Sequence, residues 1–399
     1  MIQHILKQIW IQSRRNAWIF AELFIVFILA WYIIDYGFML IHNRMLSRGF
    51  DIENTYRVNH RDLTTEADKE AFRIFYDKVK RYPGVQNAFL TGKYSGTTPF
   101  CGSFSGDVVR PDTTSASESF GAQLKPVGSE NYFSIFKVKS VINPDKLGHL
   151  NFSDKNSIVL SENLAKALFK DEPAYGKTVF VGTSPYVVSD VVASQKRYDY
   201  EQHCYSFFYQ RNDSTVREPE IAIRVGENFS LQNFKNDITG SIVSYKAVKY
   251  NMEAMDGTTN NIRMRSGVMI FFLLNIALGI IGTFWFRNQA RRNEIGLRMA
   301  LGSSRNKLQA QYIAEAILLL TLAAIPAFCV NAFLVQADVI EVVGQQVANS
   351  GYITNNKWLR FFITNAITFI LLAIVVALSV WIPAYRASRV QPVEALREE

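Results

Sequence analysis

The sequence predicts a membrane protein with four transmembrane α-helices and a large α+β extracytoplasmic domain inserted between the first and second helices. Two observations carry this prediction. Four apolar runs are each long enough to cross a bilayer, and a long polar stretch separates the first run from the second. The mean hydropathy of +0.03 over 399 residues averages these two kinds of segment and hides the division between them.

The apolar runs cover residues 17–41, 266–286, 312–336 and 361–382. A helix needs about 20 apolar residues to cross the hydrocarbon core, and buried core helices are rarely so apolar on every face. The first run follows a basic segment, as the apolar part of a signal peptide does. It is longer than the usual stretch of about 7–15 residues, and no small-residue cleavage pattern follows it. We therefore expect an uncleaved anchor.

Basic residues at the ends of the runs orient the chain. Cytoplasmic loops of membrane proteins carry an excess of Lys and Arg, and residues 1–16, 287–311 and 383–399 each carry Lys or Arg close to a membrane end. Four spans place these three segments on one side, so we expect both termini in the cytoplasm. Residues 42–265 and the shorter loop 337–360 are then outside. The net charge of +8 is explained by this topology, and we expect no nucleic-acid partner.

The polar stretch alternates between the apolar spacings of strands and of helices. The predicted strands are residues 85–90, 158–160, 178–181, 186–192 and 221–225. The predicted helices are residues 66–81, a helix that Ser161 caps and that ends at 169, and a helix that Ser230 caps. Ser side chains at these positions can accept a hydrogen bond from a free backbone N–H of the first turn. The mixture predicts packed α+β layers.

One segment ends like a nucleotide-binding loop. Gly176-Lys177-Thr178 matches the end of the P-loop pattern, but that pattern also needs a Gly five positions before the Gly-Lys pair, where this chain has Asp171. The complete pattern occurs nowhere else in the sequence. We therefore expect no catalytic residues, no ATPase activity and no cofactor bound by this chain.

The histidines and cysteines predict no metal site. The five His residues are scattered, and no H-E-x-x-H or C-x-x-C pattern occurs. His203 and Cys204 are adjacent, and we expect such histidines at the surface. Cys101 and Cys204 could form a disulfide if the polar stretch is extracytoplasmic, but spacing alone does not show that they are close. Two unrelated thiols are the favoured interpretation.

Three acids lie within the apolar runs, where charged side chains are costly and often functional. Glu22 and Asp35 fall on different faces of one helix, about 220° apart at 100° per residue. Both are near an end of the run, and we expect them to reach the headgroups. Glu315 lies just inside the third run, where it can make a polar contact with a cation of the 287–311 loop. None of the three forms a catalytic pair.

Three segments resemble one family of permeases. Residues 291–302, Arg-Arg-Asn-Glu-Ile-Gly-Leu-Arg-Met-Ala-Leu-Gly, are similar to the R-x-x-E-I-G-[IL]-R-x-A-[LI]-G signature of macrolide-exporter-type (MacB/FtsX-like) ABC permeases. Residues 383–397 resemble the family's closing P-A-x-R-A-[AS]-R-x-x-P-[VI]-E-A-L-R pattern, and residues 312–320 the start of its next-to-last span. Residues 132–137 and 158–178 are similar to its periplasmic core domain. The chain departs from the signature at Ser303, where Ala is usual.

The resemblance implies a permease of the bacterial inner membrane that has no fused ATPase domain. Two permeases pair, either as two copies of this chain or as this chain with a homologue. Each contacts a separate ABC ATPase subunit, of which we expect two copies, and ATP and Mg are bound there. ATPase closure pushes the cytoplasmic loops, and the spans carry the movement to the ectodomains, a mechanism called mechanotransmission. Membrane lipids and a periplasmic adaptor or effector are the further partners.

The resemblance also implies roles for residues of the cytoplasmic loop. The expected ATPase-coupling residues are Glu294, Ile295, Gly296, Arg298, Leu301 and Gly302. Glu294 and Arg298 are four residues apart and can pair on one helical face. The residues expected to contact anionic headgroups and set the topology are Arg287, Arg291, Arg292 and Arg305.

Two alternatives to export of a substrate at the outer face remain open at the level of sequence. In the first, the same fold is a non-transporting, FtsX-like transmitter that controls a periplasmic hydrolase or senses a ligand. In the second, the chain is a membrane-anchored binding protein with no ATPase partner. The composition selects no substrate, because aromatic residues in the polar stretch are as easily core as contact residues.

Overall fold

A computed structural model describes most of the chain in two compact units. The described residues are 13–59, 66–92, 98–100, 108–113, 118–129, 131–210, 219–255, 257–290, 304–339 and 351–387. The first unit comprises Met1–Leu40, Asn261–Val342 and Gly351–Glu399, and the second comprises Ile41–Asn260 with Val343–Ser350.

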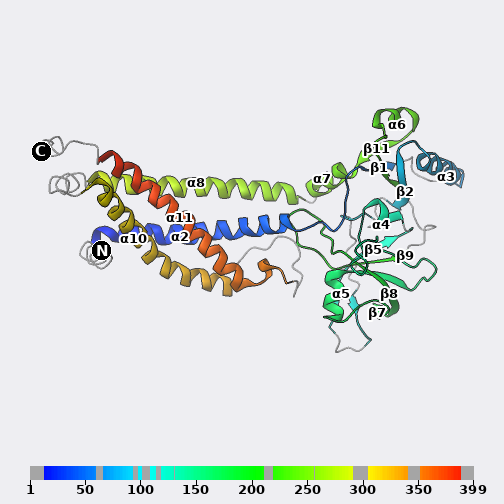
Figure 1. Ribbon diagram of the computed structural model, residues 1–399, viewed down its shortest axis with the longest axis horizontal. Coiled ribbons are helices and arrows are strands. Elements are labelled where there is room, and N and C mark those ends of the chain that lie inside the picture. Colours follow the sequence, from blue (N-terminus) through cyan, green and yellow to red (C-terminus); the bar gives the residue numbers. More distant parts are fainter. Residues whose placement is uncertain are drawn as a thin grey trace. The chain divides into compact units, whose positions relative to one another are not determined.

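The first unit is built from four long helices. They are α2 (Ser13–Met45), α8 (Thr258–Ala290), α10 (Arg305–Gln336) and α11 (Lys357–Ala387), with a short 3-10 turn η2 (Ile353–Asn355) before α11 (Figure 1). Each long helix contains a segment long and apolar enough to cross a membrane: Ala17–Met45, Thr259–Thr283, Gln309–Gln336 and Lys357–Trp381. The prediction of four membrane helices with an α+β domain between the first and second is confirmed.

Helices α2, α10 and α11 supply most of the buried core of the first unit. Small side chains on α10 (Ala316, Ala323 and Ala327) are buried in this core, and small residues let membrane helices approach closely. Among the described side chains of α8, Ile280 is the one fully buried in this core. Many apolar side chains of α8, such as Phe272, stay largely exposed in one copy of the chain.

The second unit, here called the ectodomain, contains two sheets. The first sheet is antiparallel with the order β11-β1-β10-β2. Its strands are β1 (Thr55–Asn59), β2 (Val85–Gly92), β10 (Pro219–Val225) and β11 (Ser241–Ser244). Helices α3 (Glu66–Lys80) and α6 (Leu231–Asp237) cover one face, where Phe75 and Phe234 pack with Ile221 and Ile223.

The second sheet is mixed, with the order β4-β3-β7-β8-β6-β9-β5. Its strands are β3 (Val108–Arg110), β4 (Phe120–Gly121), β5 (Gln123–Val127), β6 (Ser157–Ser161), β7 (Thr178–Val181), β8 (Ser184–Val192) and β9 (Ser206–Gln210). The pairs β5–β9 and β6–β8 are parallel. Helix α5 (Glu162–Phe169) covers one face through Leu164 and Leu168, beside β7 and β8 (Figure 1).

An aromatic core joins the two sheets. Side chains alternate between the faces of a strand, so Phe89 of β2 and Phe208 of β9 both point away from the helices that cover the outer faces. Helices α4 (Asn131–Ile135) and α7 (Tyr245–Met255) complete this core. Tyr132 of α4 packs against both Phe89 and Phe208, each with ring centroids 5.7 Å apart. The sheets therefore share one core.

The predicted ectodomain elements all occur, including the β7–β8 hairpin. The predicted cap at Ser230 is confirmed, because its side chain accepts from Asn233 N at 3.4 Å. The predicted side-chain cap at Ser161 is wrong. Ser161 precedes α5, but its hydroxyl accepts from the backbone N of Ser206 at 3.0 Å in the neighbouring strand. The Ser161 hydroxyl thus forms a buried hydrogen bond between β6 and β9 and does not cap α5.

Candidate functional site

The residues predicted to couple to an ATPase lie outside the described part of the chain. These are Glu294, Ile295, Gly296, Arg298, Leu301 and Gly302, together with Arg291 and Arg292. The structure places their flanks: α8 runs through Arg287 and ends at Ala290, and α10 begins at Arg305. The assigned roles of these residues stay predictions.

A buried ion pair connects α2 and α11 inside the first unit. Arg360 Nε donates to Asp35 Oδ1 at 2.9 Å, and Arg360 Nη2 donates to Asp35 Oδ2. Asp35 is 4% exposed and Arg360 is 2% exposed. The expectation that Asp35 reaches the headgroups is therefore wrong. Arg360 immediately precedes the uncharged fourth run, and its guanidinium matches the carboxylate in a two-bond geometry that offsets burial of both charges.

Neutral polar side chains on these helices and on α10 form further hydrogen bonds between helices. Trp31 Nε1 on α2 donates to Thr364 Oγ1 on α11 at 3.0 Å. Asn331 on α10 donates to Asn365 on α11 at 3.0 Å, and both are buried. Hydrogen bonds between membrane helices contribute on the order of 0.6 kcal/mol or more each. Together with the ion pair they hold α2, α10 and α11 in register.

Two further acids lie nearer the cytoplasmic ends of the helices under the predicted topology. Glu22 on α2 accepts from Thr283 Oγ1 on α8, with both carboxylate oxygens 3.0 Å away. Glu22 therefore contacts another helix, in contrast to the expectation that it reaches the headgroups. Glu315 on α10 is buried, at 4% exposed. Lys307 is the cation of the 287–311 loop whose side chain is described, and the other cations lie outside the described residues or have undescribed side chains, so that pairing stays a prediction.

The last turn of α2 belongs to the ectodomain and is held there by a loop at residues 196–200. Lys196 Nζ donates to the backbone O of Asn43 at 2.8 Å and of Asp199 at 3.2 Å. Asn43 Nδ2 donates to Tyr200 O at 2.9 Å. Lys196 is 2% exposed and Asn43 is fully buried. Burial, with Arg48 and Lys249 nearby, lowers the pKa of Lys196 to about 8 against the attraction of Asp199.

The same loop is tied to α7 by charges. Lys249 on α7 lies 2.7 Å from Asp199 and 3.1 Å from Glu253. Arg48, just after α2, contacts Asp199 at 3.0 Å. Burial alone would raise the pKa of Asp199, but Lys249 and Arg48 hold it below its ordinary value. Asp199 therefore stays ionised at neutral pH and connects two segments that lie far apart in the sequence.

His203 and Cys204 follow this loop and are both buried, so the expectation of a surface histidine is wrong here. His203 Nε2 lies 2.7 Å from the backbone O of Ser47, and burial lowers the pKa of His203. The buried thiol of Cys204 donates to the backbone O of Gln195 at 3.4 Å, and burial raises the pKa of Cys204. Cys101 lies outside the described residues, so the structure does not test a Cys101–Cys204 pairing.

The segment that resembles the end of a P-loop makes local contacts. Lys177 forms an ion pair with Glu172, and its ammonium lies 4.6 Å from the centre of the Phe169 ring. Gly176 has a φ of +75°, a conformation that favours glycine, and β7 follows at Thr178. The segment therefore forms a turn between α5 and β7.

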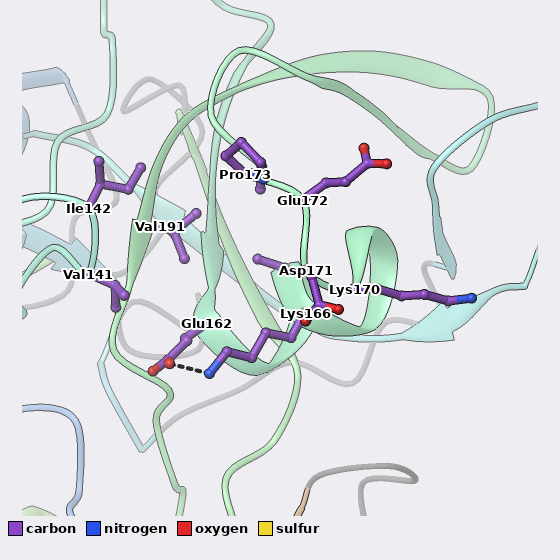
Figure 2. Close-up of a pocket in the computed structure, with 11 residues that line it drawn as sticks. Val141, Ile142, Glu162, Lys166, Lys170, Asp171, Glu172, Pro173 and Val191 are labelled. Atoms are coloured by element: carbon purple, nitrogen blue, oxygen red, sulfur yellow. Dashed lines mark hydrogen bonds and ion pairs between the residues drawn. The ribbon is translucent and has the colours of Figure 1, made fainter.

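A pocket of about 620 Å³ lies beside α5 in the ectodomain. Figure 2 shows Val141, Ile142 and Val191 on one side and the ion pair of Glu162 with Lys166 at the rim. That pair spans 2.6 Å. Lys170, Asp171 and Glu172 also line the pocket, so its lining is part apolar and part charged and specifies no ligand class. Across the described ranges, no group of three or more His, Cys, Asp or Glu side chains is arranged to hold a metal ion.

Two family models match this chain. The model of the FtsX-like permease C-terminal region matches residues 266–392, which include α10 and α11. The model of the MacB-like periplasmic core domain matches residues 49–241, which contain most of both sheets. These matches and the four membrane helices define a multi-pass membrane protein of the ABC permease class. The chain belongs to the MacB/FtsX-like permease family.

Similar curated proteins are macrolide export ATP-binding/permease proteins named MacB. The Escherichia coli strain K12 protein is 24% identical over 267 residues, which are 61% of this chain and 38% of that protein. The Aggregatibacter actinomycetemcomitans protein is 25% identical over 238 residues, or 53% of this chain and 36% of that protein. The chain therefore spans well under half of the length of these relatives.

Two solved structures that are similar to this chain are of isolated domains. The periplasmic region of MacB from Actinobacillus actinomycetemcomitans is 17% identical, with a TM-score of 0.32, and the match covers 52% of this chain and 95% of that one. The extracellular domain of the noncanonic ABC-type transporter YknZ from Gram-positive bacteria is 13% identical, with a TM-score of 0.28, and the match covers 46% of this chain and 88% of that one.

Proposed function

We propose that this chain is the permease subunit of an ABC transporter whose ATPase is a separate subunit. ATP hydrolysis there moves the ectodomain through the four helices, and this movement drives export or extraction of a substrate at the outer face of the bacterial inner membrane. Membership of the permease family carries the proposal. The Glu294-Ile295-Gly296-Leu297-Arg298 string between α8 and α10 supplies the expected contact with the ATPase.

The contacts inside the first unit support transmission of movement. Asp35 and Arg360 pair with each other, and Asn331 pairs with Asn365. These bonds hold three helices in register, as a rigid element that transmits movement requires. Helix α2 is a single uninterrupted helix from Ser13 to Met45, so a shift at its cytoplasmic end is carried along its axis.

The partners follow from the same proposal. Two ATPase subunits bind ATP and Mg, and a second permease, identical or homologous, pairs with this chain. The largely uncovered apolar side of α8 is a surface suited to lipid or to that second permease. Both termini are in the cytoplasm, and Arg287, Arg291, Arg292 and Arg305 contact anionic headgroups. A periplasmic adaptor or effector contacts the ectodomain.

The test changes the proposed ATPase contact. In Glu294→Ala combined with Ile295→Ala, we expect the chain to insert in the membrane normally but to co-purify with at least tenfold less ATPase, because a charged and an apolar contact are both lost. The matched control is Arg291→Ala with Arg292→Ala, which changes two residues assigned to headgroups. It should retain the ATPase. Normal ATPase recovery and ATPase rate in the Glu294/Ile295 variant would contradict the coupling assignment.

The nature of the ectodomain's partner separates transport from signal transmission. Capture of the full-length chain from membranes should bring down an export adaptor if the complex transports. Recovery of a cell-wall hydrolase in its place would favour the non-transporting transmitter. Recovery of no ATP-binding protein at all would contradict the proposed function.

A further inference from the structure

Two helices that lead towards the membrane contact one loop of the ectodomain. The last turn of α2 contacts residues 196–200, and so does α7, which ends at Met255 just before α8 begins at Thr258. We call these contacts of residues 196–200 with Asn43, Arg48 and Lys249 the joint. All of its residues lie within the second unit.

Lys196 donates a hydrogen bond to a backbone carbonyl at the end of α2. The last carbonyls of a helix have no partner within the helix, and a buried carbonyl without a hydrogen bond is costly. Asn43 lies in the last turn of α2 and is fully buried. Its carbonyl accepts from Lys196 Nζ at 2.8 Å. A cation at this end also interacts favourably with the helix dipole.

The burial of Lys196 shows that its position is strongly determined. A lysine that is 2% exposed has its ammonium largely removed from water, which is unfavourable unless it is hydrogen-bonded. The ammonium donates to two backbone carbonyls, one of them on α2. The lowered pKa of Lys196 reflects the same burial. Burial and hydrogen bonding therefore fix the Lys196 ammonium against the Asn43 carbonyl more firmly than an exposed lysine would be fixed.

Asp199 extends the connection to α7. Its carboxylate contacts Lys249 at 2.7 Å and Arg48 at 3.0 Å, and its backbone N lies 3.4 Å from Glu253 Oε1. Lys249 is buried and also contacts Glu253. The loop is thus bonded to the end of α2 on one side and to α7 on the other. Neither helix end can shift without changing these bonds.

We propose that Lys196 and Asp199 are positioning residues that fix the end of α2 and helix α7 to one loop, so that movement of α2 is passed to the ectodomain. The role in transmission rests on the proposed function, whereas the joint itself is a property of this chain alone. Movement that reaches Asn43 passes through Lys196 to Asp199 and on to Lys249 of α7, which precedes α8 in the chain. The two helix ends therefore shift together.

The first measurement tests the joint without an ATPase. Hydrogen exchange is followed by mass spectrometry on the full-length chain in lipid nanodiscs, in peptides covering residues 41–48 and 245–255. Asp199→Asn should speed exchange in both peptides by roughly tenfold, because it removes charge-assisted bonds to both segments. Lys196→Met should speed exchange mainly in residues 41–48. The matched control is Lys166→Met, which removes an exposed ion pair with Glu162 and should leave both peptides unchanged.

The second measurement tests transmission, which a merely structural role would not affect. In the complex with its ATPase, spin labels at Asp145→Cys, and at the matching position of the second permease where that is a homologue, report the distance between the two ectodomains, with Cys101 and Cys329 replaced by serine. ATP should change this distance in the parent and in Lys166→Met. Asp199→Asn should abolish the change while the ATPase rate stays within about twofold.

The outcomes distinguish failure of the proposed joint from failure of the proposed function. Unchanged exchange in Asp199→Asn, or a full ATP-dependent distance change in that variant, would overturn the proposed role of the joint. A parent complex without any ATP-dependent change would overturn the proposed function and the transmission role, and the exchange data would still decide whether the joint exists. If Lys196→Met does not fold, Asp199→Asn alone decides, because it keeps the backbone carbonyl that Lys196 contacts.

Discussion

At the scale of single residues, Lys196 is a side chain whose environment differs greatly from that of a free lysine. Its ammonium contacts the carbonyls of Asn43 and Asp199, and burial lowers its pKa from 10.5 to about 8. The charged groups that act on it are Asp199, Arg48 and Lys249. The contribution of Lys196 to the free energy of unfolding therefore depends on pH.

Between about pH 8 and 10.5 the folded chain has largely lost the proton of Lys196, whereas the unfolded chain still holds it. Stability rises with pH wherever the unfolded state binds more protons. We expect the free energy of unfolding of the parent, minus that of Lys196→Met, to increase across this range. Chemical unfolding of both proteins in detergent at several pH values measures it. A flat or falling difference would show that Lys196 is not buried in this way.

At the scale of helices, the polar contacts connect α2 to its neighbours at two levels. Glu22 contacts Thr283 on α8, and Asp35 contacts Arg360 on α11. The sequence predicts that the two acids face different sides of α2, and in the structure they contact different helices. The pairing itself was not predictable, because Asp35 and Arg360 are 325 positions apart and only packing of the helices brings them together.

The Asp35–Arg360 pair makes a prediction about helix packing. Removal of one partner leaves an uncompensated buried charge, so Asp35→Asn and Arg360→Met should each destabilise the first unit by about 3–5 kcal/mol. The double variant Asp35→Leu with Arg360→Met buries no charge and should recover most of that loss. Apparent melting temperatures in detergent compare the three. A double variant that is as unstable as the sum of the singles would show that the two side chains do not act as a pair.

At the scale of the whole molecule, the sequence was sufficient for the membrane helices and for most ectodomain elements. Apolar runs of this length are typical of membrane helices, and the spacing that predicts α3, α5 and the β7–β8 hairpin is local. Contacts between residues that lie far apart in the sequence could not be predicted from local spacing. Lys196 and Asn43 are 153 positions apart, and Ser161 contacts Ser206 in preference to its own helix. The burial of His203 has the same cause, since its contact is with Ser47.

One part of the candidate site could be predicted from the sequence, and the other part is seen only in the structure. A family signature predicts the ATPase-coupling loop around Glu294, because the residues of that signature are contiguous in the sequence. The joint at Lys196 and Asp199 has no such pattern, since its members come from α2, a loop and α7. The sequence therefore predicts the loop that contacts the ATPase. The structure supports the joint as the place where movement of α2 is passed to the ectodomain.

One measurement tests the central claim most directly. In the complex of full-length permease and its ATPase, the distance between the two ectodomains is recorded with and without ATP, for the parent and for Glu294→Ala with Ile295→Ala. The labels are at Asp145→Cys and, where the second permease is a homologue, at its matching position. We predict an ATP-dependent change of distance in the parent that is absent from the variant. The same distance with and without ATP in the parent would contradict the claim that this chain transmits ATPase movement to its ectodomain.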